Sequence, residues 1–134
     1  MQPVPGAENR GKTILVVEEE EGIRNLLLLA LSRAGFKVLL TGNGHDAVKF
    51  YQSQGPTIDL VLMDVRMQGM DGPTTFTALR SLNEHIRCCF MTGDTSSDRE
   101  QELLALGGLH VFRKPFPSLS QLVRTLESFL DHPG

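Results

Sequence analysis

The chain has 134 residues, of which 40% are hydrophobic and 22% are charged, and these proportions suit one globular domain with a single core. A formal net charge of -3 excludes the basic surface that binding to nucleic acid or to an anionic membrane requires. The longest apolar helical run, 26–31, is far short of the roughly 20 residues that span a membrane, and the N-terminus has no apolar signal-peptide core. We therefore expect a cytoplasmic protein.

The two cysteines, Cys88 and Cys89, are adjacent in the sequence. Neighbouring residues of a strand point to opposite faces, so a disulfide between them would be strained. They also lack the Cys-x-x-Cys spacing of a zinc or redox site. We predict two buried, reduced thiols.

Apolar runs and helical periodicities alternate along the chain from about residue 13. The residues before them, 1–11, carry two prolines, two glycines and no periodic pattern, and we predict a flexible arm there. Five short strands are expected at 13–17, 37–40, 59–63, 87–91 and 109–112. A helix is expected after each strand, beginning near Glu20, Asn43, Gly72, Ser97 and Ser118. The folded domain is therefore predicted over 12–131, with a short tail at 132–134.

Local signals mark the predicted helix ends. Asn43 is suited to an N-cap, Pro73 to a first turn, and Ser97 to Glu100 form a capping-box pattern. Gly35 is a natural stop for the first helix. The predicted core stripes are Ile23, Leu26, Leu27, Ala30, Leu31 and Ala34 in the first helix, Phe76, Leu79 and Leu82 in the third, and Leu103, Leu104 and Leu106 in the fourth.

Strict alternation of strands and helices with short connections indicates a parallel sheet that is covered by helices on both faces. Five strands are too few for a closed eight-stranded barrel. The predicted fold class is α/β, a flavodoxin-like doubly wound (βα)5 domain with a five-stranded parallel sheet.

Polar side chains follow the predicted strands at their carboxyl ends, where such sheets form their ligand crevice. Glu18 and Glu19 follow the first strand, Asp64 the third, Thr92 the fourth and Lys114 the fifth. Each residue alone is weak evidence. Asp64 could be a solvated acid at a strand end, and the glutamates at 18–21 could be the acidic start of a helix.

Together these residues indicate one kind of chemistry. Three carboxylates in one crevice repel each other unless a cation neutralises them, and oxygen ligands of this sort suit Mg²⁺. An exposed, metal-bound Asp64 can attack a phosphoryl group while an ammonium and a hydroxyl steady its oxygens. The expected product is an acyl phosphate on Asp64.

The order of an acid pair, an Asp before a Gly-rich turn (Gly69–Gly72), a Thr and a Lys-Pro pair resembles the receiver domain of two-component response regulators. The resemblance extends from residue 13 to about 131. It implies that Asp64 is the phosphoacceptor, that Thr92 and Lys114 contact the phosphoryl group, and that Glu18, Glu19 and the backbone carbonyl of Arg66 help to hold Mg²⁺. It also implies a cis peptide bond before Pro115.

The same resemblance implies the partners. The phosphodonor would be a phosphohistidine on a sensor histidine kinase or a histidine phosphotransfer protein, and phosphorylation would shift the population of a surface that binds an unidentified output partner. No direct contact with nucleic acid or membrane is expected. The domain would be no enzyme beyond its own phosphorylation and dephosphorylation.

Two positions depart from the family pattern. The second member of the acid pair is usually Asp, and here it is Glu19, which is one methylene longer. Val111 occupies the position three residues before the lysine, where the family often has Tyr or Phe as a rotamer switch.

Two other functions compete with the phosphoacceptor. The double Glu could abolish useful Mg²⁺ binding, which would leave a pseudo-receiver that acts as a phosphorylation-independent protein-interaction module. A small phosphatase with Asp64 as nucleophile is the third hypothesis. Haloacid-dehalogenase-type sites carry a second Asp two residues after the nucleophile, and Arg66 at that position argues against it.

Overall fold

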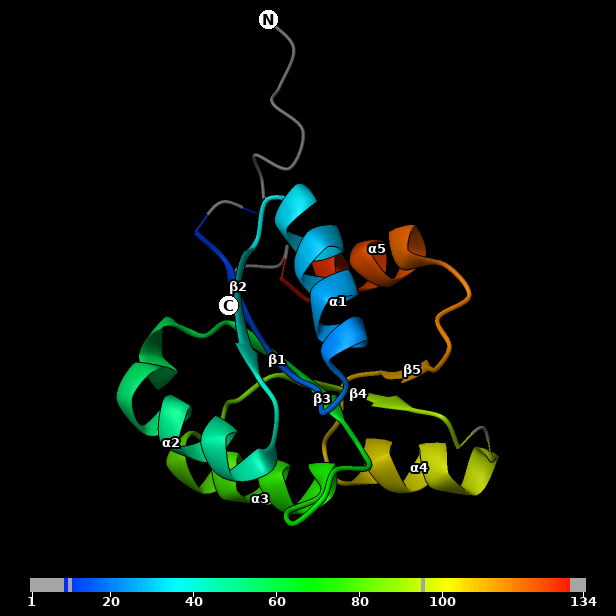
Figure 1. Ribbon diagram of the computed structural model, residues 1–134. Helices are drawn as coiled ribbons and strands as arrows, with labels where there is room; N and C mark the ends of the chain where they lie inside the picture. Colours follow the sequence, from blue (N-terminus) through cyan, green and yellow to red (C-terminus); the bar gives the residue numbers. More distant parts are fainter. Residues whose placement is uncertain (1–8, 10, 95, 131–134) are drawn as a thin grey trace, which may run out of the picture.

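The computed structural model describes residues 9, 11–94 and 96–130, so the predicted tail and most of the predicted arm lie outside the described residues. Strands and helices alternate along the chain (Figure 1). The strands are β1 (Thr13–Val17), β2 (Lys37–Thr41), β3 (Leu60–Asp64), β4 (Cys88–Thr92) and β5 (Val111–Arg113). The helices are α1 (Glu21–Arg33), α2 (Gly44–Gln54), α3 (Gly72–Leu82), α4 (Ser97–Ala105) and α5 (Leu119–Leu130), and the 3-10 turn η2 (Gly55–Thr57) follows α2.

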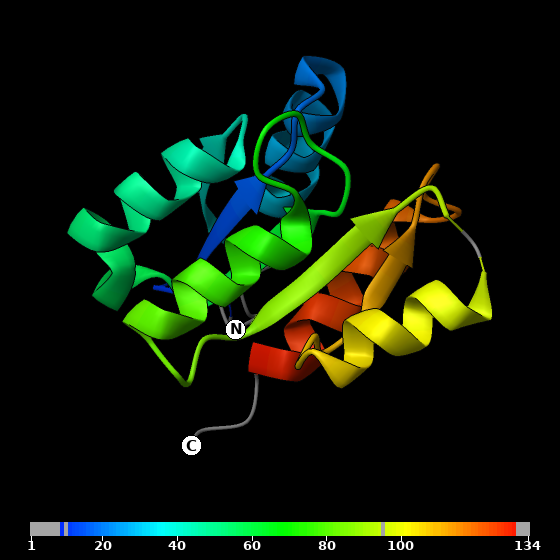
Figure 2. The ribbon, with the colours of Figure 1, turned by 90° about the horizontal axis from the view of Figure 1, so that it is seen from below.

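The strands form one parallel sheet in the order β2-β1-β3-β4-β5. Helices α1 and α5 cover one face of the sheet, and α2, α3 and α4 cover the other (Figures 1 and 2). The predicted flavodoxin-like α/β fold is therefore confirmed. Because β1 lies between β2 and β3, the order of strands reverses at this point, and the carboxyl ends of β1 and β3 border the crevice that such a reversal creates.

The three inner strands, β1, β3 and β4, are fully buried and mostly apolar because helices cover both faces of the sheet. Alternate residues of β1 enter different cores: Ile14 packs with α1 and α5, whereas Leu15 packs with α2, α3 and α4. Cys88 and Cys89 separate in the same way, and both are buried free thiols, as predicted. Burial raises the pKa of the Cys89 thiol to about 12, so it stays protonated.

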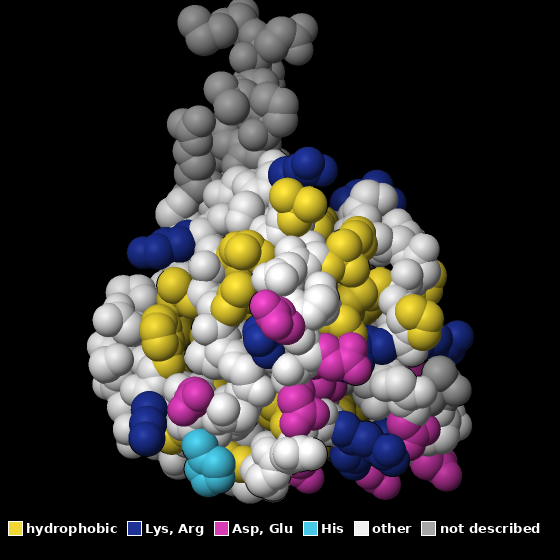
Figure 3. Space-filling model, in the orientation of Figure 1, with side chains coloured by type: hydrophobic (Ala, Val, Ile, Leu, Met, Phe, Trp, Pro, Cys, Tyr) yellow, Lys and Arg dark blue, Asp and Glu magenta, His cyan; other side chains and the backbone are white. Residues whose placement is uncertain are grey.

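The prediction that several helical leucines lie in the core is wrong. In α1 only Leu27 and Leu31 are fully buried, whereas Leu26 is 43% exposed, and Leu82, Leu104 and Leu106 are also exposed. Successive residues of a helix are about 100° apart, so a stripe centred on Leu27 and Leu31 turns Leu26 toward solvent. Figure 3 shows hydrophobic side chains at the surface over α1.

Some element ends also differ from the prediction. The N-cap of α4 is Ser96 rather than Ser97, because the Ser96 hydroxyl accepts a hydrogen bond from the Arg99 N–H at 3.3 Å. Strand β5 begins at Val111 rather than at residue 109, and β3 ends at Asp64 rather than at residue 63. The last difference places Asp64 within the ordered end of the sheet.

Candidate functional site

The polar residues that were predicted from the strand ends meet at the carboxyl edge of the sheet. Asp64 is the last residue of β3, Thr92 is the last residue of β4, and Lys114 directly follows β5. A hollow of about 590 Å³ opens over them, and it is lined by Glu19, Glu20, Asp64, Arg66, Thr92, Gly93, Asp94 and Lys114. Figure 3 shows acidic side chains gathered near the first turn of α1, beside this edge.

Lys114 links the two buried carboxylates of the site. Its Nζ lies 3.0 Å from Asp64 Oδ1 and 2.9 Å from Glu18 Oε1, and neither carboxylate has appreciable exposure. One ammonium therefore forms ion pairs with two carboxylates that are shielded from solvent. This arrangement leaves the cluster one negative charge in excess when both acids are ionised.

Burial and the excess charge together govern the titration of the site. The pKa of Asp64 is raised to about 7, first because burial disfavours its charged form and then because Glu18 is hydrogen-bonded to it and negatively charged; Lys114 acts in the opposite direction. The pKa of Glu18 is lowered: burial alone would raise it, but hydrogen bonds from Asp64, Lys114 and the Glu20 N–H outweigh burial. In the absence of a cation, the pair therefore takes up one proton as the pH falls through about 7.

The two members of the acid pair have different surroundings. Glu18 is fully buried, does not line the hollow, and accepts a hydrogen bond from the Glu20 N–H at 3.2 Å as well as from Lys114. Glu19 is exposed, lines the hollow, and accepts a hydrogen bond from the Gln68 N–H at 3.0 Å. Glu19 is therefore the member of the pair that faces the opening.

Gly72 sets the position of the Asp64 backbone. Its N–H donates to the Val65 carbonyl at 2.8 Å, and a Cβ at residue 72 would stand 2.4 Å from the Asp64 carbonyl oxygen. Asp71 caps α3, because its Oδ1 accepts from the Thr74 N–H at 2.8 Å. The first turn of α3 thus approaches β3 more closely than any side chain at position 72 would allow.

Thr92 is buried beside the hollow, and its Oγ1 accepts a hydrogen bond from the Asp94 N–H at 3.0 Å. The hydroxyl proton remains available for a further acceptor. A smaller hollow of about 200 Å³ adjoins Thr92 and is also lined by Val111, where the family often has an aromatic side chain. The peptide bond between Lys114 and Pro115 is cis, as the resemblance predicted.

Several residues at this edge were not predicted from the sequence. Glu20 and Asp94 line the hollow, and the N–H of Gln68 holds Glu19. Asp94 follows Thr92 by two residues, and that spacing after a strand end is the signal that could have identified it. The Gln68 contact has no such signal because it depends on the path of the loop between β3 and α3.

The donor set suits a hard cation that keeps much of its water. Among the described residues, no three His, Cys, Asp or Glu side chains are grouped closely enough to hold a metal by themselves. Four acidic residues nevertheless line the hollow, and two of them, Glu19 and Asp64, are the predicted metal ligands that lie there with Arg66. Mg²⁺ takes one or two carboxylates and retains several waters, so these oxygen donors fit it.

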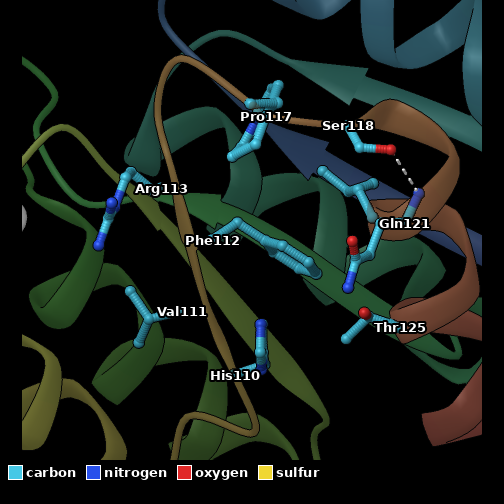
Figure 4. A pocket seen from close by; sticks show the side chains of 10 residues that line it. His110, Val111, Phe112, Arg113, Pro117, Ser118, Gln121 and Thr125 are labelled. Atoms are coloured by element: carbon cyan, nitrogen blue, oxygen red, sulfur yellow. Dashed lines mark hydrogen bonds between the residues drawn. The ribbon is translucent and has the colours of Figure 1, made fainter.

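A second hollow, of about 280 Å³, lies between β5 and α5 (Figure 4). Its lining includes Phe112, Phe116 and Leu122, and no Asp or Glu belongs to it. Within it the Ser118 hydroxyl accepts a hydrogen bond from the Gln121 N–H at 3.1 Å, which caps the start of α5. This hollow lacks the acids that phosphoryl chemistry or a cation would need.

Fold and site together define a signalling-type α/β domain with a buried acid–lysine cluster at the carboxyl edge of its sheet. Residues 14–127 match the family model described as the response regulator receiver domain, and the chain belongs to this family of two-component signalling domains. Within the described residues, no helix is long and apolar enough to cross a membrane.

Three similar proteins illustrate the family. Sporulation initiation phosphotransferase F of Bacillus subtilis is 36% identical over 103 residues, which cover 77% of this chain and 82% of that protein. The transcriptional regulatory protein ZraR of Salmonella typhimurium is 37% identical over 124 residues, which cover 92% of this chain but only 27% of that protein. The structure of chemotaxis protein CheY4 of Vibrio cholerae has a TM-score of 0.79 and 28% identity, and the match covers 87% of this chain and 97% of that chain.

Proposed function

We propose that this domain is a phosphoacceptor of a two-component phosphorelay, which receives a phosphoryl group on Asp64 and thereby changes the binding of a partner. The observation that carries the proposal is the position of Asp64. It is the last residue of β3, lines the hollow, and lies 3.0 Å from the ammonium of Lys114. The proposed receiver spans 12–131, works in the cytoplasm, and carries an arm at 1–11 and a tail at 132–134.

The proposed reaction is a transfer between a phosphohistidine and a carboxylate. An Asp64 oxygen forms a bond to phosphorus, while the bond from phosphorus to the donor imidazole nitrogen breaks and its electron pair stays on that nitrogen. Lys114 neutralises charge on the transferred oxygens, and Thr92 donates its hydroxyl proton to one of them. We propose no enzymatic activity beyond the phosphorylation and dephosphorylation of Asp64.

The proposed cofactor is Mg²⁺, held by Glu19, Asp64 and the backbone carbonyl of Arg66. When bound, Mg²⁺ would supply positive charge that keeps Asp64 ionised and offsets the charge of the phosphoryl oxygens. Glu18 is also among the proposed metal-site residues, but it would act through its negative charge. Its side chain is buried, and its oxygens accept hydrogen bonds from Lys114 and the Glu20 N–H.

The proposed phosphodonor is a sensor histidine kinase or a histidine phosphotransfer protein. Membership in the receiver family supports this proposal, as does similarity to a protein that is named for phosphoryl transfer, Sporulation initiation phosphotransferase F. Phosphorylation of Asp64 would then shift the population of conformations that bind an output partner.

Intact-mass spectrometry after incubation with acetyl phosphate tests the proposal. We expect a Mg²⁺-dependent gain of one phosphoryl group in the wild type and in Asp98→Asn, a control in the exposed first turn of α4, and no gain in Asp64→Asn. Absence of any gain in the wild type with Mg²⁺ or Mn²⁺ would overturn the phosphoacceptor for small donors.

A pseudo-receiver is the second candidate, and one observation favours it. The carboxylates of the acid pair already have partners within the protein: Glu18 accepts hydrogen bonds from Lys114 and the Glu20 N–H, and Glu19 accepts one from the Gln68 N–H. A thermal unfolding series with Mg²⁺ separates the two candidates. A phosphoacceptor with a working site gains about 2.7 kcal/mol at a cation concentration one hundred times the dissociation constant, whereas a pseudo-receiver gains nothing.

A further inference from the structure

Arg24 lies in the first turn of α1, and its side chain binds the backbone of the loop between β1 and α1. One guanidinium nitrogen, Nη1, donates hydrogen bonds of 2.8 Å to the Glu18 carbonyl and 2.8 Å to the Glu19 carbonyl. Arg24 is half-buried, and of these two charge-assisted bonds the one to the Glu18 carbonyl is partly buried while the one to the Glu19 carbonyl is exposed. A single cationic donor therefore fixes the two consecutive peptide groups that carry the acid pair.

The planarity of the peptide bond transmits this contact to the acids. In a trans peptide the carbonyl and the following N–H point in opposite directions. Because the Glu19 carbonyl points at Arg24, the Glu20 N–H must point away from Arg24, and it donates to Glu18 Oε2 at 3.2 Å. The other oxygen of Glu18 bonds Lys114, so Arg24 acts through the backbone on the whole acid–lysine cluster.

The neighbouring loop leaves space for the guanidinium. A Cβ at Gly42, which directly follows β2, would stand 3.2 Å from Arg24 Nη1. The end of β2 is itself tied to the same loop, because the Glu18 N–H donates to the Thr41 carbonyl at 3.1 Å. Arg24 thus sits between two loops, and the absence of a side chain at Gly42 permits its position.

We propose that Arg24 is a positioning residue that fixes the backbone of Glu18 and Glu19 so that the site can bind a divalent cation. The proposal rests on the proposed function of the site. Arg24 does not touch the reacting atoms: its two donated bonds go to carbonyls, and it is absent from the lining of the hollow. Its effect should therefore appear in cation affinity before it appears in the fold.

The test compares Arg24→Met and Arg24→Lys, measuring Mn²⁺ binding through the electron paramagnetic resonance signal of free Mn²⁺. The methionine variant keeps the apolar stem and loses the donors. We expect its dissociation constant for Mn²⁺ to rise roughly 10- to 100-fold, the range seen when the groups that orient metal ligands are removed. Since one nitrogen makes both contacts, a lysine ammonium can replace it, and the lysine variant should recover most of the affinity.

Controls separate positioning from general damage. Arg33→Met makes the same change in the last turn of α1, and we expect wild-type Mn²⁺ binding and unfolding midpoint there. Wild-type affinity in Arg24→Met, or equal losses in the Met and Lys variants, would overturn the role of the donated bonds. Mass spectrometry after acetyl phosphate treatment is run in parallel. A wild type that neither binds Mn²⁺ nor gains a phosphoryl group refutes the proposed function along with the role of Arg24, whereas a working wild type beside an unaffected Arg24→Met refutes only the latter.

Discussion

Glu19 reaches across the opening of the site to the backbone of Gln68, and its carboxylate accepts a hydrogen bond of 3.0 Å from the Gln68 N–H. The contact joins the loop after β1 to the loop after β3, which also contains Arg66. The contact engages one oxygen of the carboxylate, Oε1, and leaves Oε2 as the oxygen offered to a cation. The extra methylene of Glu19, compared with the usual Asp, gives the side chain this reach.

Two substitutions separate the reach of Glu19 from its charge. Glu19→Gln keeps the length and a carbonyl oxygen that can accept from Gln68, whereas Glu19→Asp keeps the charge and shortens the side chain. In metal-free protein we expect faster amide hydrogen exchange at 68–71 in Glu19→Asp and wild-type exchange in Glu19→Gln. For Mg²⁺ we expect the reverse, with weaker binding in Glu19→Gln. Equal exchange in all three proteins would contradict a tie between the loops.

The raised pKa of Asp64 predicts how stability depends on pH. The value of about 7 in the folded protein exceeds the ordinary 3.8, so the folded state binds more protons than the unfolded state between these values. Stability therefore falls as pH rises from about 4 to about 7. The lowered pKa of Glu18 acts in the opposite direction: its stabilisation is present above the ordinary 4.5 and is lost at lower pH.

Asp64→Asn removes the unfavourable ionisation of Asp64. In metal-free buffer we expect the variant to be more stable than the wild type at pH 8, by on the order of 2 kcal/mol, and the gain to shrink toward pH 4. Urea unfolding of both proteins between pH 4 and pH 8 measures the difference. A gain that is independent of pH would show that burial and charge at Asp64 do not cause it.

The sequence predicted the sheet and the residues at its carboxyl edge because both depend on local patterns. The inner strands are apolar runs; Asp64 and Thr92 end two of them, and Lys114 directly follows the last strand. Which helical leucines are buried was harder to predict. Leu26 and Leu27 are the same residue type at adjacent positions, and only the packing of α1 against the sheet distinguishes them. The burial of Glu18 and the contacts of Arg24 depend on loop geometry, which no periodicity encodes.

Gly72 offers a direct test of how closely α3 must approach Asp64. In Gly72→Ala the added Cβ would stand 2.4 Å from the Asp64 carbonyl and 2.9 Å from Val65 Cα, both backbone atoms, so the start of α3 must move. We expect a loss of about 1–3 kcal/mol in the free energy of unfolding, together with slower phosphoryl uptake. Gly22→Ala is the matched control, because its Cβ would meet nothing within 4 Å; it should be neutral or slightly stabilising. Equal stability of the two variants would contradict the close approach.

The hollow beside Thr92 predicts that an aromatic side chain fits at position 111. Val111 packs toward the core of α2, α3 and α4 and lines this hollow of about 200 Å³. A ring in Val111→Phe would fill existing space, so we expect a gain of about 0.5–2 kcal/mol in the free energy of unfolding, as is common when cavities are filled. Val61→Phe makes the same change at a fully buried position of β3, where overpacking should cost about 1–3 kcal/mol. Urea unfolding of both variants measures these changes. If the free energy of unfolding fell as much in Val111→Phe as in Val61→Phe, the hollow could not accept a ring. Thr92 would then have no room for an aromatic neighbour in this protein.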